Sequence, residues 1–290
     1  GVELAGQVAI LARRVLRGEY RHIDPRHARV VLIDAVAEVL SALPRTLSEH
    51  GRRALEGLGV EVELDARVVG VDRGGVEIED AGGQHRRLEA RTVIWAAGVR
   101  ASPLAALLAR ASGAGLDGSG RLELDASLTL PGHAEVFVIG DMATLPGVPG
   151  TAQPAIQQGK YAASVILARL AGRSGPTAFR YRDLGTMATI GRTKAVADLF
   201  GRVRIWGFPA FVVWGVVHLA YLVGWGNRFE AVARWMWTLL ARNRRERLIS
   251  VVSLASDEAG REQLAVLRGS PRPSARRRQA AGAADQQRKR

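Results

Sequence analysis

The 290-residue sequence contains no cysteine, and this absence excludes several kinds of chemistry. A chain without thiols can form no disulfide, no thiolate metal site and no redox-active dithiol. Its six histidines are scattered without metal-ligand spacing such as H-E-x-x-H, so no metal site is predicted. Site chemistry must therefore come from carboxylates, amides and backbone groups, or from a cofactor that they hold.

Acidic residues are scarce in the last third of the chain. Residues 191–290 carry 19 Lys and Arg against 7 Asp and Glu, so nearly all of the formal charge of +13 lies there. A basic region of this kind favours either nucleic acid or an anionic membrane as its partner. The neighbouring residues 205–227 carry no formal charge and are rich in Trp and Tyr, which favours the membrane, and no nucleic acid is expected.

Helical and strand-like patterns alternate over the first 100 residues. Apolar residues recur every three or four positions over 2–16, and a second helical pattern over 43–59 ends at glycines. Short apolar runs at 28–35 and 91–99 are typical of buried parallel strands, and residues 60–80 predict two or three strands with a turn at 73–75. This order predicts an α/β fold with a doubly wound parallel sheet and a ligand at the carboxyl ends of its strands.

The patterns after residue 120 extend the same scheme. A buried strand is expected over 134–143, a loop and helix over 151–172, and short strands over 179–201. From residue 256 onward the composition cannot form a core and predicts disorder.

Two hydrophobic segments follow the short strands. The uncharged run 205–227 has about the length of a membrane span, roughly 20 residues, but a proline and glycines interrupt it. Residues 228–248 predict an amphipathic helix whose arginines face lipid headgroups, and a buried core helix is the alternative. These arginines are Arg228, Arg242, Arg244 and Arg245.

The opening stretch GVELAG is typical of the first helix of a dinucleotide-binding unit. In such units the last glycine of G-x-G-x-x-G lets the helix pack on the sheet, and the cofactor pyrophosphate lies at the helix N-terminus. Gly1 can be that glycine, so the chain is expected to be an N-terminally truncated fragment that lacks the preceding strand. An ordinary amphipathic helix that begins with glycine is the alternative.

Asp34 strengthens the dinucleotide interpretation. It follows an apolar run, at the strand end where a carboxylate accepts hydrogen bonds from ribose hydroxyls and repels a 2′-phosphate, so NAD(H) is favoured over NADP(H). Its distance in sequence from Gly1 exceeds the usual roughly 20 residues, so an enlarged helix or loop must intervene. An ordinary strand-end aspartate remains the alternative.

Seven stretches resemble, in order, the type II NADH dehydrogenases, which are non-proton-pumping, FAD-dependent NADH:quinone oxidoreductases. The resemblance covers residues 1–237 and corresponds to the C-terminal two thirds of such an enzyme. It implies an FAD/NAD(P)-binding fold with two dinucleotide-binding domains, N-terminally truncated, followed by a C-terminal amphipathic membrane-binding helical region. The stretches are GVELAG, RVVLIDA, TVIWAAGVRASPLA, GHAEVFVIGDMA, AQPAIQQGKYAA, YRDLGTMATIGR and VHLAYLVGWGNRFEAVARWMW.

The resemblance also implies a division into parts, cofactors and partners. The parts are an NADH-binding domain without its first strand (1–98), the C-terminal part of an FAD-binding domain (99–172), a membrane-binding region (173–255) and a disordered basic tail (256–290). The implied cofactors are FAD and NADH, and the implied partners are a quinone, an anionic membrane surface and a second copy in a homodimer. The implied location is the cytoplasmic face of the bacterial cell membrane, with peripheral or monotopic attachment.

In the NADH-binding half, the resemblance places Gly1 and Gly6 on the nucleotide-binding helix. Glu3 would point to the junction of nicotinamide and flavin, where a carboxylate positions the nicotinamide or relays protons. Its alternative role is that of an ordinary first-turn glutamate favoured by the helix dipole.

In the FAD-binding half, the resemblance places Gly98, Gly140, Asp141 and Ala152 at the cofactor. Gly98 and Gly140 would let the cofactor approach the backbone closely, since glycine has no side chain. Asp141 would accept hydrogen bonds from the ribitol hydroxyls.

Two glutamines complete the site that the resemblance implies, and at one position this chain differs from the family. Gln153 and Gln157 are spaced i and i+4, so they share a helix face, and their amides could donate to a quinone carbonyl. In YRDLGTMATIG the family often has a lysine where this chain has Leu184, which puts turnover or local geometry in doubt.

Two rival functions compete with this interpretation. A flavin disulfide reductase of similar fold is excluded because the chain has no cysteine. A basic membrane-associated binding protein with a degenerate dinucleotide-binding fold and no activity is the remaining alternative, but it would not need acidic residues at strand ends and helix starts. The oxidoreductase hypothesis predicts that Asp34 and Asp141 open onto one common cleft.

Overall fold

The structure, a computed structural model, describes residues 1–240, with side chains for residues 1–237. The described residues belong to one compact unit. Three of the arginines expected at lipid headgroups, Arg242, Arg244 and Arg245, lie outside the described residues, as does the tail expected to be disordered from residue 256.

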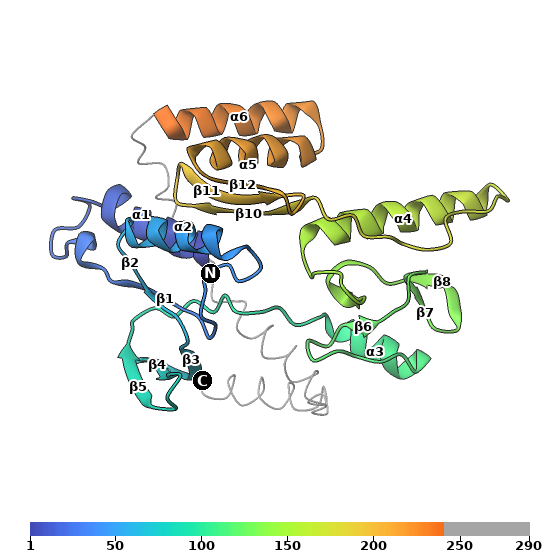
Figure 1. Cartoon of the computed structure of the whole chain (residues 1–290), viewed down its shortest axis with the longest axis horizontal. Helices are drawn as coiled ribbons and strands as arrows, with labels where there is room; N and C mark the ends of the chain where they lie inside the picture. Colours follow the sequence, from blue (N-terminus) through green and yellow to red (C-terminus); the bar gives the residue numbers. More distant parts are fainter. Residues whose placement is uncertain (241–290) are drawn as a thin grey trace, which may run out of the picture. The chain divides into compact units, whose positions relative to one another are not determined.

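The chain begins with a helix and a parallel pair of strands. Helix α1 (Val2–Ile10) continues into one π-helical segment (Leu11–Val15), which confirms the helix expected over 2–16. Strand β1 (Val30–Ile33) pairs in parallel with β2 (Val60–Glu63), and α2 (Arg45–Glu56) connects them. This β-α-β unit confirms the pattern predicted for residues 28–63 (Figure 1).

An antiparallel sheet follows, and two of its strands lie where residues 60–80 predict two or three strands with a turn. It has the order β3-β4-β5 and contains β3 (Arg67–Asp72), β4 (Gly75–Glu79) and β5 (His85–Glu89). At the β3–β4 turn, Asp72 Oδ1 accepts hydrogen bonds from the backbone N–H groups of Gly74 (2.7 Å) and Gly75 (3.1 Å). The Arg87 guanidinium on β5 donates to both Asp72 oxygens, at 2.9 and 2.7 Å, so one carboxylate joins the turn to the third strand.

Substituting Arg87 with glutamine is expected to raise the pKa of Asp72. The Arg87 guanidinium and the turn amides hold this pKa at about 2, below its ordinary value of 3.8. Because the pKa of Asp72 is lower in the folded state than in the unfolded state, its ionised carboxylate stabilises the fold. This contribution to the free energy of unfolding is complete above pH 4 and is lost as the pH falls from about 4 to about 2. NMR titration of the carboxyl carbon checks this: the pKa should rise toward 3.8 in the variant, and an unchanged value would contradict it.

Residues 91–99 do not form the buried strand that their apolar run predicts, so that expectation is wrong. They have no regular secondary structure, and Ile94, Trp95 and Val99 are exposed. Trp95 Nε1 donates to the Ala97 carbonyl at 2.8 Å, a contact within the segment itself. A strand is stable only when a neighbouring strand takes its backbone hydrogen bonds, and no strand in the described part of the chain pairs with this segment.

The strand expected over 134–143 is shorter and less buried than predicted. Strand β8 (His133–Phe137) pairs antiparallel with β7 (Thr129–Leu130), its first three residues are exposed, and the chain turns into a 3₁₀ helix at Gly140–Met142. Within the described residues the parallel pairs are β1–β2 and β6–β9, the latter formed by Leu122–Glu123 and Ala143–Thr144. The predicted doubly wound parallel sheet is therefore represented by two separate parallel pairs.

Two helices accompany these short strands. Helix α3 (Pro103–Ser112) begins at Ser102, whose hydroxyl accepts from the Leu104 N–H, and ends at Gly113 in the left-handed conformation. Helix α4 (Ala152–Leu170) confirms the helix expected over 151–172. A separate apolar cluster lies under α3 and includes Ala105, Leu122 and Val138.

The C-terminal part is a layered arrangement around a three-stranded sheet, two strands of which confirm the short strands expected over 179–201. Strands β10 (Gly185–Ile190), β11 (Lys194–Leu199) and β12 (Val203–Gly207) form an antiparallel sheet. Helices α1 and α2 cover one face, α5 (Phe208–Tyr221) covers the other, and α6 (Trp225–Leu240) packs on α5 (Figure 1).

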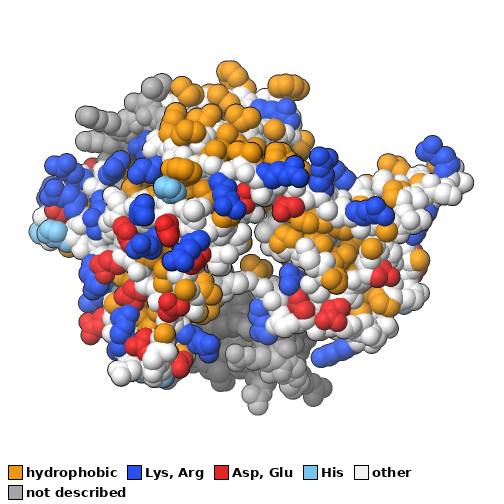
Figure 2. Space-filling model, viewed as in Figure 1, with side chains coloured by type: hydrophobic (Ala, Val, Ile, Leu, Met, Phe, Trp, Pro, Cys, Tyr) orange, Lys and Arg blue, Asp and Glu red, His pale blue; other side chains and the backbone are white. Residues whose placement is uncertain are grey.

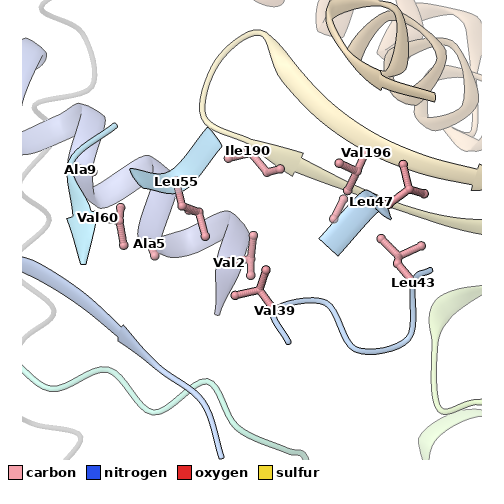
Figure 3. Packing of buried hydrophobic residues seen from close by; sticks show 11 residues of the cluster. Val2, Ala5, Ala9, Val39, Leu43, Leu47, Leu55, Val60, Ile190 and Val196 are labelled. Atoms are coloured by element: carbon pink, nitrogen blue, oxygen red, sulfur yellow. The ribbon is translucent and has the colours of Figure 1, made fainter. Parts of the chain in front are cut away.

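The alternation of β11 explains this layering, because successive strand residues point to opposite faces. Val196 joins the cluster under α1 and α2, whereas Ala195 and Ala197 pack toward α5. Figure 3 shows side chains of α1, α2 and the sheet meeting in that first cluster. Its members include Val2, Ala5, Ala9, Val39, Leu43, Leu47, Leu55, Val60, Ile190 and Val196.

The uncharged run 205–227 is divided among the end of β12, the whole of α5 and the first residues of α6. Gly207, with φ of 74°, is the last residue of β12 and the N-cap of the 14-residue α5. Among the described residues, none of the helices has the length and apolar character needed to cross a bilayer. Trp214 on α5 stacks on Trp235 of α6, with ring centroids 5.5 Å apart, which fixes the two helices together.

From the sequence, Arg228 was expected to face lipid headgroups, but in the structure its guanidinium binds the end of a neighbouring helix. Its guanidinium donates to the carbonyls of Leu222 (2.9 Å) and Ala220 (3.0 Å) at the C-terminal end of α5 and lies over the Trp225 ring. The last carbonyls of a helix lack intrahelical partners, so a nearby cation satisfies them and the helix dipole together.

Candidate functional site

A hollow of about 270 Å³ lies where three segments meet. The N-terminus of α1, the loop before α2 and the first half of β10 each supply part of its wall. Its lining residues are Gly1, Val2, Glu3, Leu40, Ala42, Leu43, Thr186, Met187 and Ala188. Because a helix N-terminus presents unpaired N–H groups and a partial positive charge, the hollow suits an acceptor-rich ligand.

Glu3 is the ionisable side chain of this hollow, and a single residue holds it. Its Oε1 accepts two hydrogen bonds from Thr189 on β10, one from the backbone N–H and one from the hydroxyl, each 2.9 Å long. Thr189 is 8% exposed, whereas Glu3 is exposed. One carboxylate oxygen is thus fixed against the sheet, and the other, Oε2, has no hydrogen bond to the described protein.

The two glycines of α1 play different structural roles. Gly1 is the N-cap residue of α1 and lines the hollow. Gly6 is buried, and a Cβ there would lie 3.0 Å from the Gly191 nitrogen, so glycine allows α1 to approach the β10–β11 turn closely. Gln7 Nε2 donates to the Gly191 carbonyl at 3.0 Å and holds this approach.

The loop that supplies Leu40 is under backbone strain. Leu40 has φ of 54°, a left-handed conformation that costs a non-glycine residue on the order of 1–3 kcal/mol. Its neighbour Val39 is 1% exposed and Leu43 is 5% exposed, so burial on both sides offsets the strain. Strained residues of this kind are concentrated at binding sites, and Leu40 lines the hollow.

Asp34 lies directly after β1, as the sequence predicts, and is half-buried. Its backbone continues the ladder, because its N–H donates to Glu63 O at 2.9 Å and its carbonyl accepts from the Ala66 N–H at 3.0 Å. Its Oδ1 accepts one long hydrogen bond, 3.4 Å, from the Val36 N–H. The carboxylate therefore keeps most of its acceptor capacity at a strand end.

Gly140 and Asp141 form a short 3₁₀ turn that follows β8. Gly140 has φ of 68°, a left-handed conformation that favours glycine. Asp141 is exposed, and no described side chain or backbone group donates to its carboxylate. Gly98 also has a left-handed backbone, with φ of 81°, and open space where a Cβ would stand.

Gln158 on α4 holds this turn, and it was not singled out from the sequence. It is 2% exposed on α4, and its Oε1 accepts a 2.6 Å hydrogen bond from the Gly140 N–H. The signal in the sequence was the second glutamine of the pair QQ in AQPAIQQG, which the spacing argument for Gln153 and Gln157 passed over. Gln158 ties the Gly140 turn to the helix.

Gln153 and Gln157 face the 182–185 segment, and both are engaged with its backbone. Gln153 Nε2 donates to the Gly185 carbonyl at 2.9 Å. Gln157 donates to the Arg182 carbonyl at 2.8 Å and accepts from the Arg182 N–H at 3.0 Å. These contacts hold the chain entering β10, and each amide group has a second N–H that these hydrogen bonds do not use.

Ala152 and Leu184 lie at the start of α4 and directly before β10, respectively. Ala152 is the exposed first residue of α4, and Leu184 is half-buried one residue before β10. Leu184 supplies no charge at a place where the resemblance led us to expect a lysine.

The structure therefore brings some of the predicted site residues together and leaves others apart. Gly1 and Glu3 share the hollow, whereas Asp34, Gly98, Gly140 and Asp141 do not line it. Neither this hollow nor the next one described is lined by Asp34 or Asp141, so neither is the common cleft expected between these two carboxylates. A second hollow, about 520 Å³, is lined by Asp125, Thr129 and residues 130–134, and none of the predicted site residues lies there. In the described residues no group of three or more His, Asp or Glu side chains could hold a metal ion.

A family model described as pyridine nucleotide-disulphide oxidoreductase matches residues 1–159, which carry Glu3, Asp34, Gly98 and the Gly140 turn. The chain belongs to this family. Its mixed helices and strands, with the β1–α2–β2 unit at the start, are the FAD/NAD-binding fold of the family, so the fold predicted from the sequence is confirmed at this level. The family's name refers to disulphide chemistry, for which these 290 residues hold no cysteine.

Sequence identity to known proteins confirms the resemblance to type II NADH dehydrogenases. The chain is 44% identical over 277 residues to the type II NADH:quinone oxidoreductase Ndh of Mycobacterium tuberculosis, a match that covers 95% of this chain and 59% of that protein. It is 35% identical over 212 residues to the type II NADH:quinone oxidoreductase of Staphylococcus haemolyticus, covering 70% of this chain and 50% of that protein. The chain thus spans about half to three fifths of the length of these relatives.

A solved structure supports the fold. NDH2 from Plasmodium falciparum, in complex with NADH, matches with a TM-score of 0.73 at 16% identity, covering 83% of this chain and 64% of that chain. At this identity the match concerns the arrangement of helices and strands.

Proposed function

We propose that the protein transfers electrons from NADH to a quinone at a membrane surface, with FAD as its cofactor. The observation that supports this most is the Glu3 carboxylate, fixed on one side by Thr189 and presented on the other to a hollow at a helix N-terminus. The 44% identity to a type II NADH:quinone oxidoreductase supports the same activity.

For NADH, we propose that Gly1, Glu3 and Asp34 form the binding residues. The α1 N-terminus at Gly1 offers N–H groups to the pyrophosphate, and Asp34 keeps acceptor capacity for the ribose hydroxyls. A carboxylate at this strand end repels a 2′-phosphate, which favours NADH over NADPH. Glu3 would then accept a hydrogen bond from the nicotinamide carboxamide.

For FAD, the residues after β8 fit the demands of the cofactor. FAD, when bound, accepts a hydride from NADH and passes two electrons on to the quinone. The exposed Asp141 carboxylate lacks donors in the described protein and suits the ribitol hydroxyls, while the left-handed Gly140 and Gly98 leave space for close approach. Ala152, at the N-terminus of α4, would adjoin the same cofactor.

Gln158→Leu is expected to weaken FAD binding about tenfold. The substitution removes the acceptor of the half-buried Gly140 N–H, and leaving a donor unpaired costs up to about 1–3 kcal/mol when it is kept from water, unless the turn moves. Equilibrium dialysis of FAD against the purified protein measures the effect. Gln158→Glu keeps an acceptor oxygen and serves as the control, which should bind FAD nearly as tightly as the parent; equal loss in both variants would contradict this role of the turn.

For the quinone, we propose a site on the 182–185 segment near α4. Gln153 and Gln157 would hold the backbone of this segment with one amide N–H each, which leaves a second N–H on each side chain to donate to a quinone carbonyl. Leu184 would make the local wall apolar, so proton delivery would not depend on a lysine at this position.

The membrane-facing surface would be formed by α5 and α6. Figure 2 shows hydrophobic side chains gathered over these helices, with Lys and Arg side chains along one margin. On α6 the exposed Trp225, Phe229, Val232 and Met236 are spaced to share one side of the helix. A helix with one apolar side lies in the plane of the interface, and nearby cations favour anionic lipids.

We further propose, from the resemblance to the family, that two copies of the protein form a homodimer. We also propose that it attaches, peripherally or monotopically, to the cytoplasmic face of a bacterial membrane. Anionic vesicles stand for this membrane surface in the test below.

The test is NADH oxidation by the purified protein supplied with FAD, anionic vesicles and a short-chain quinone. Loss of NADH absorbance that requires both quinone and FAD supports the proposal, and NADPH should be a much poorer donor. Binding to vesicles without NADH oxidation would instead identify a membrane-associated binding protein without activity.

A further inference from the structure

Thr189 controls the direction of the Glu3 side chain. Two donors from one residue converge on one oxygen, Glu3 Oε1, at 2.9 Å each. A single hydrogen bond lets a carboxylate swing about the contact, whereas two donors with fixed positions locate the oxygen. The donors are fixed because Thr189 is 8% exposed and lies in the paired strand β10.

The backbone around this contact is also held. Gln7 binds the Gly191 carbonyl one helical turn along α1, and Gly6 allows the helix to lie close to the Gly191 backbone. Helix α1 is therefore anchored to the β10–β11 turn independently of Glu3. The Thr189 hydroxyl is not needed to dock the helix, so its contribution is concentrated on the Glu3 side chain.

The same strand also lines the hollow. Thr186 and Met187 of β10 contribute to its wall together with Glu3, so the strand that fixes Oε1 also borders the space available to a ligand. Once Oε1 is held by Thr189, Oε2 remains to accept a hydrogen bond from a ligand.

We propose that Thr189 is a positioning residue for NADH, acting through Glu3. By holding Oε1 it sets Oε2 to accept a hydrogen bond from the carboxamide N–H of the nicotinamide. This inference rests on one part of the proposed function, namely that NADH is the ligand of the hollow. Valine has nearly the shape of threonine and keeps the backbone N–H, so Thr189→Val removes one of the two donors alone.

The experiment is a double-mutant cycle on NADH binding by the FAD-loaded protein, followed by nicotinamide fluorescence. The FAD is reduced with dithionite beforehand, so that no hydride is transferred during the titration. Thr189→Val is expected to raise the Kd for NADH about tenfold, the range of one charge-assisted hydrogen bond. Thr189→Ser keeps the hydroxyl and should restore the Kd to within about twofold of the parent. In a Glu3→Ala background, Thr189→Val should change the Kd by less than about twofold, because the group it positions is gone.

Two results would overturn the inference. One is an equal increase in Kd with and without Glu3, which would show that Thr189 acts on folding or on the strand. The other is a Kd unchanged by Thr189→Val. Parent protein that binds NADH but does not reduce quinone would refute the proposed function while the cycle still decides the role of Thr189. Parent protein that binds no NADH would refute both.

Discussion

Substituting Trp225, Phe229 and Met236 with serine is expected to weaken binding to anionic phospholipid vesicles by at least about 100-fold. These side chains are 82%, 77% and 49% exposed on α6. Their spacing of four and seven residues places them on one side of the helix. Burying a large apolar side chain contributes about 1.5–3 kcal/mol, so three together exceed the roughly 2.7 kcal/mol that corresponds to a 100-fold change.

Vesicle co-sedimentation measures this effect, and a matched control separates location from hydrophobicity. Trp95 and Ile94 are also exposed, at 63% and 55%, but lie outside α5 and α6. Serine at both of these positions should leave the partition coefficient within about twofold of the parent value. If the α6 variant sediments with vesicles as fully as the parent, the proposed membrane surface is wrong.

Substituting Gly185 with alanine is expected to lower the free energy of unfolding by about 3 kcal/mol or more. Gly185 has φ of 102° at the start of β10, and a Cβ there would collide with the Asp198 carbonyl and lie 2.9 Å from Leu199 Cα. Both neighbours are backbone atoms of β11, so neither can move aside without breaking the strand pair. The Gln153 contact with the Gly185 carbonyl would be disturbed as well.

Gly201→Ala is the matched control for this substitution. Gly201 also has a left-handed backbone, with φ of 64°, but a Cβ there would meet no atom within 4 Å beyond its chain neighbours. Its alanine variant should lose only the conformational cost, about 1–2 kcal/mol. Urea denaturation compares the two; equal losses would show that the clash with β11 contributes nothing.

Much of the fold could be predicted where the pattern was local. The strands expected over 60–80 and over 179–201 are found, because hairpin partners are neighbours in sequence. Their antiparallel pairing was not predicted from the sequence. The apolar runs at 91–99 and 134–143 suggested buried strands, but hydrophobicity does not say which strand will pair with a run. The first is irregular and exposed, and the second pairs as the short antiparallel β8.

The contacts of the candidate site could not be predicted from local sequence patterns either. Glu3 was singled out from the resemblance, and the structure places it at a hollow. Its partner Thr189 is 186 residues away along the chain, a separation that no local pattern reports. Gln158 was missed because its partner, the Gly140 N–H, is a backbone group, and backbone groups leave no signal in sequence. The backbone contacts of Gln153 and Gln157 are likewise visible only in the folded chain.

The most direct test of the account is a crystal structure of the FAD-loaded protein with NADH. The account predicts the nicotinamide carboxamide within hydrogen-bond distance of Glu3 and the adenosine ribose at Asp34, with the Thr189–Glu3 contact intact. A nicotinamide outside the hollow, or no bound dinucleotide at saturating NADH, would contradict it.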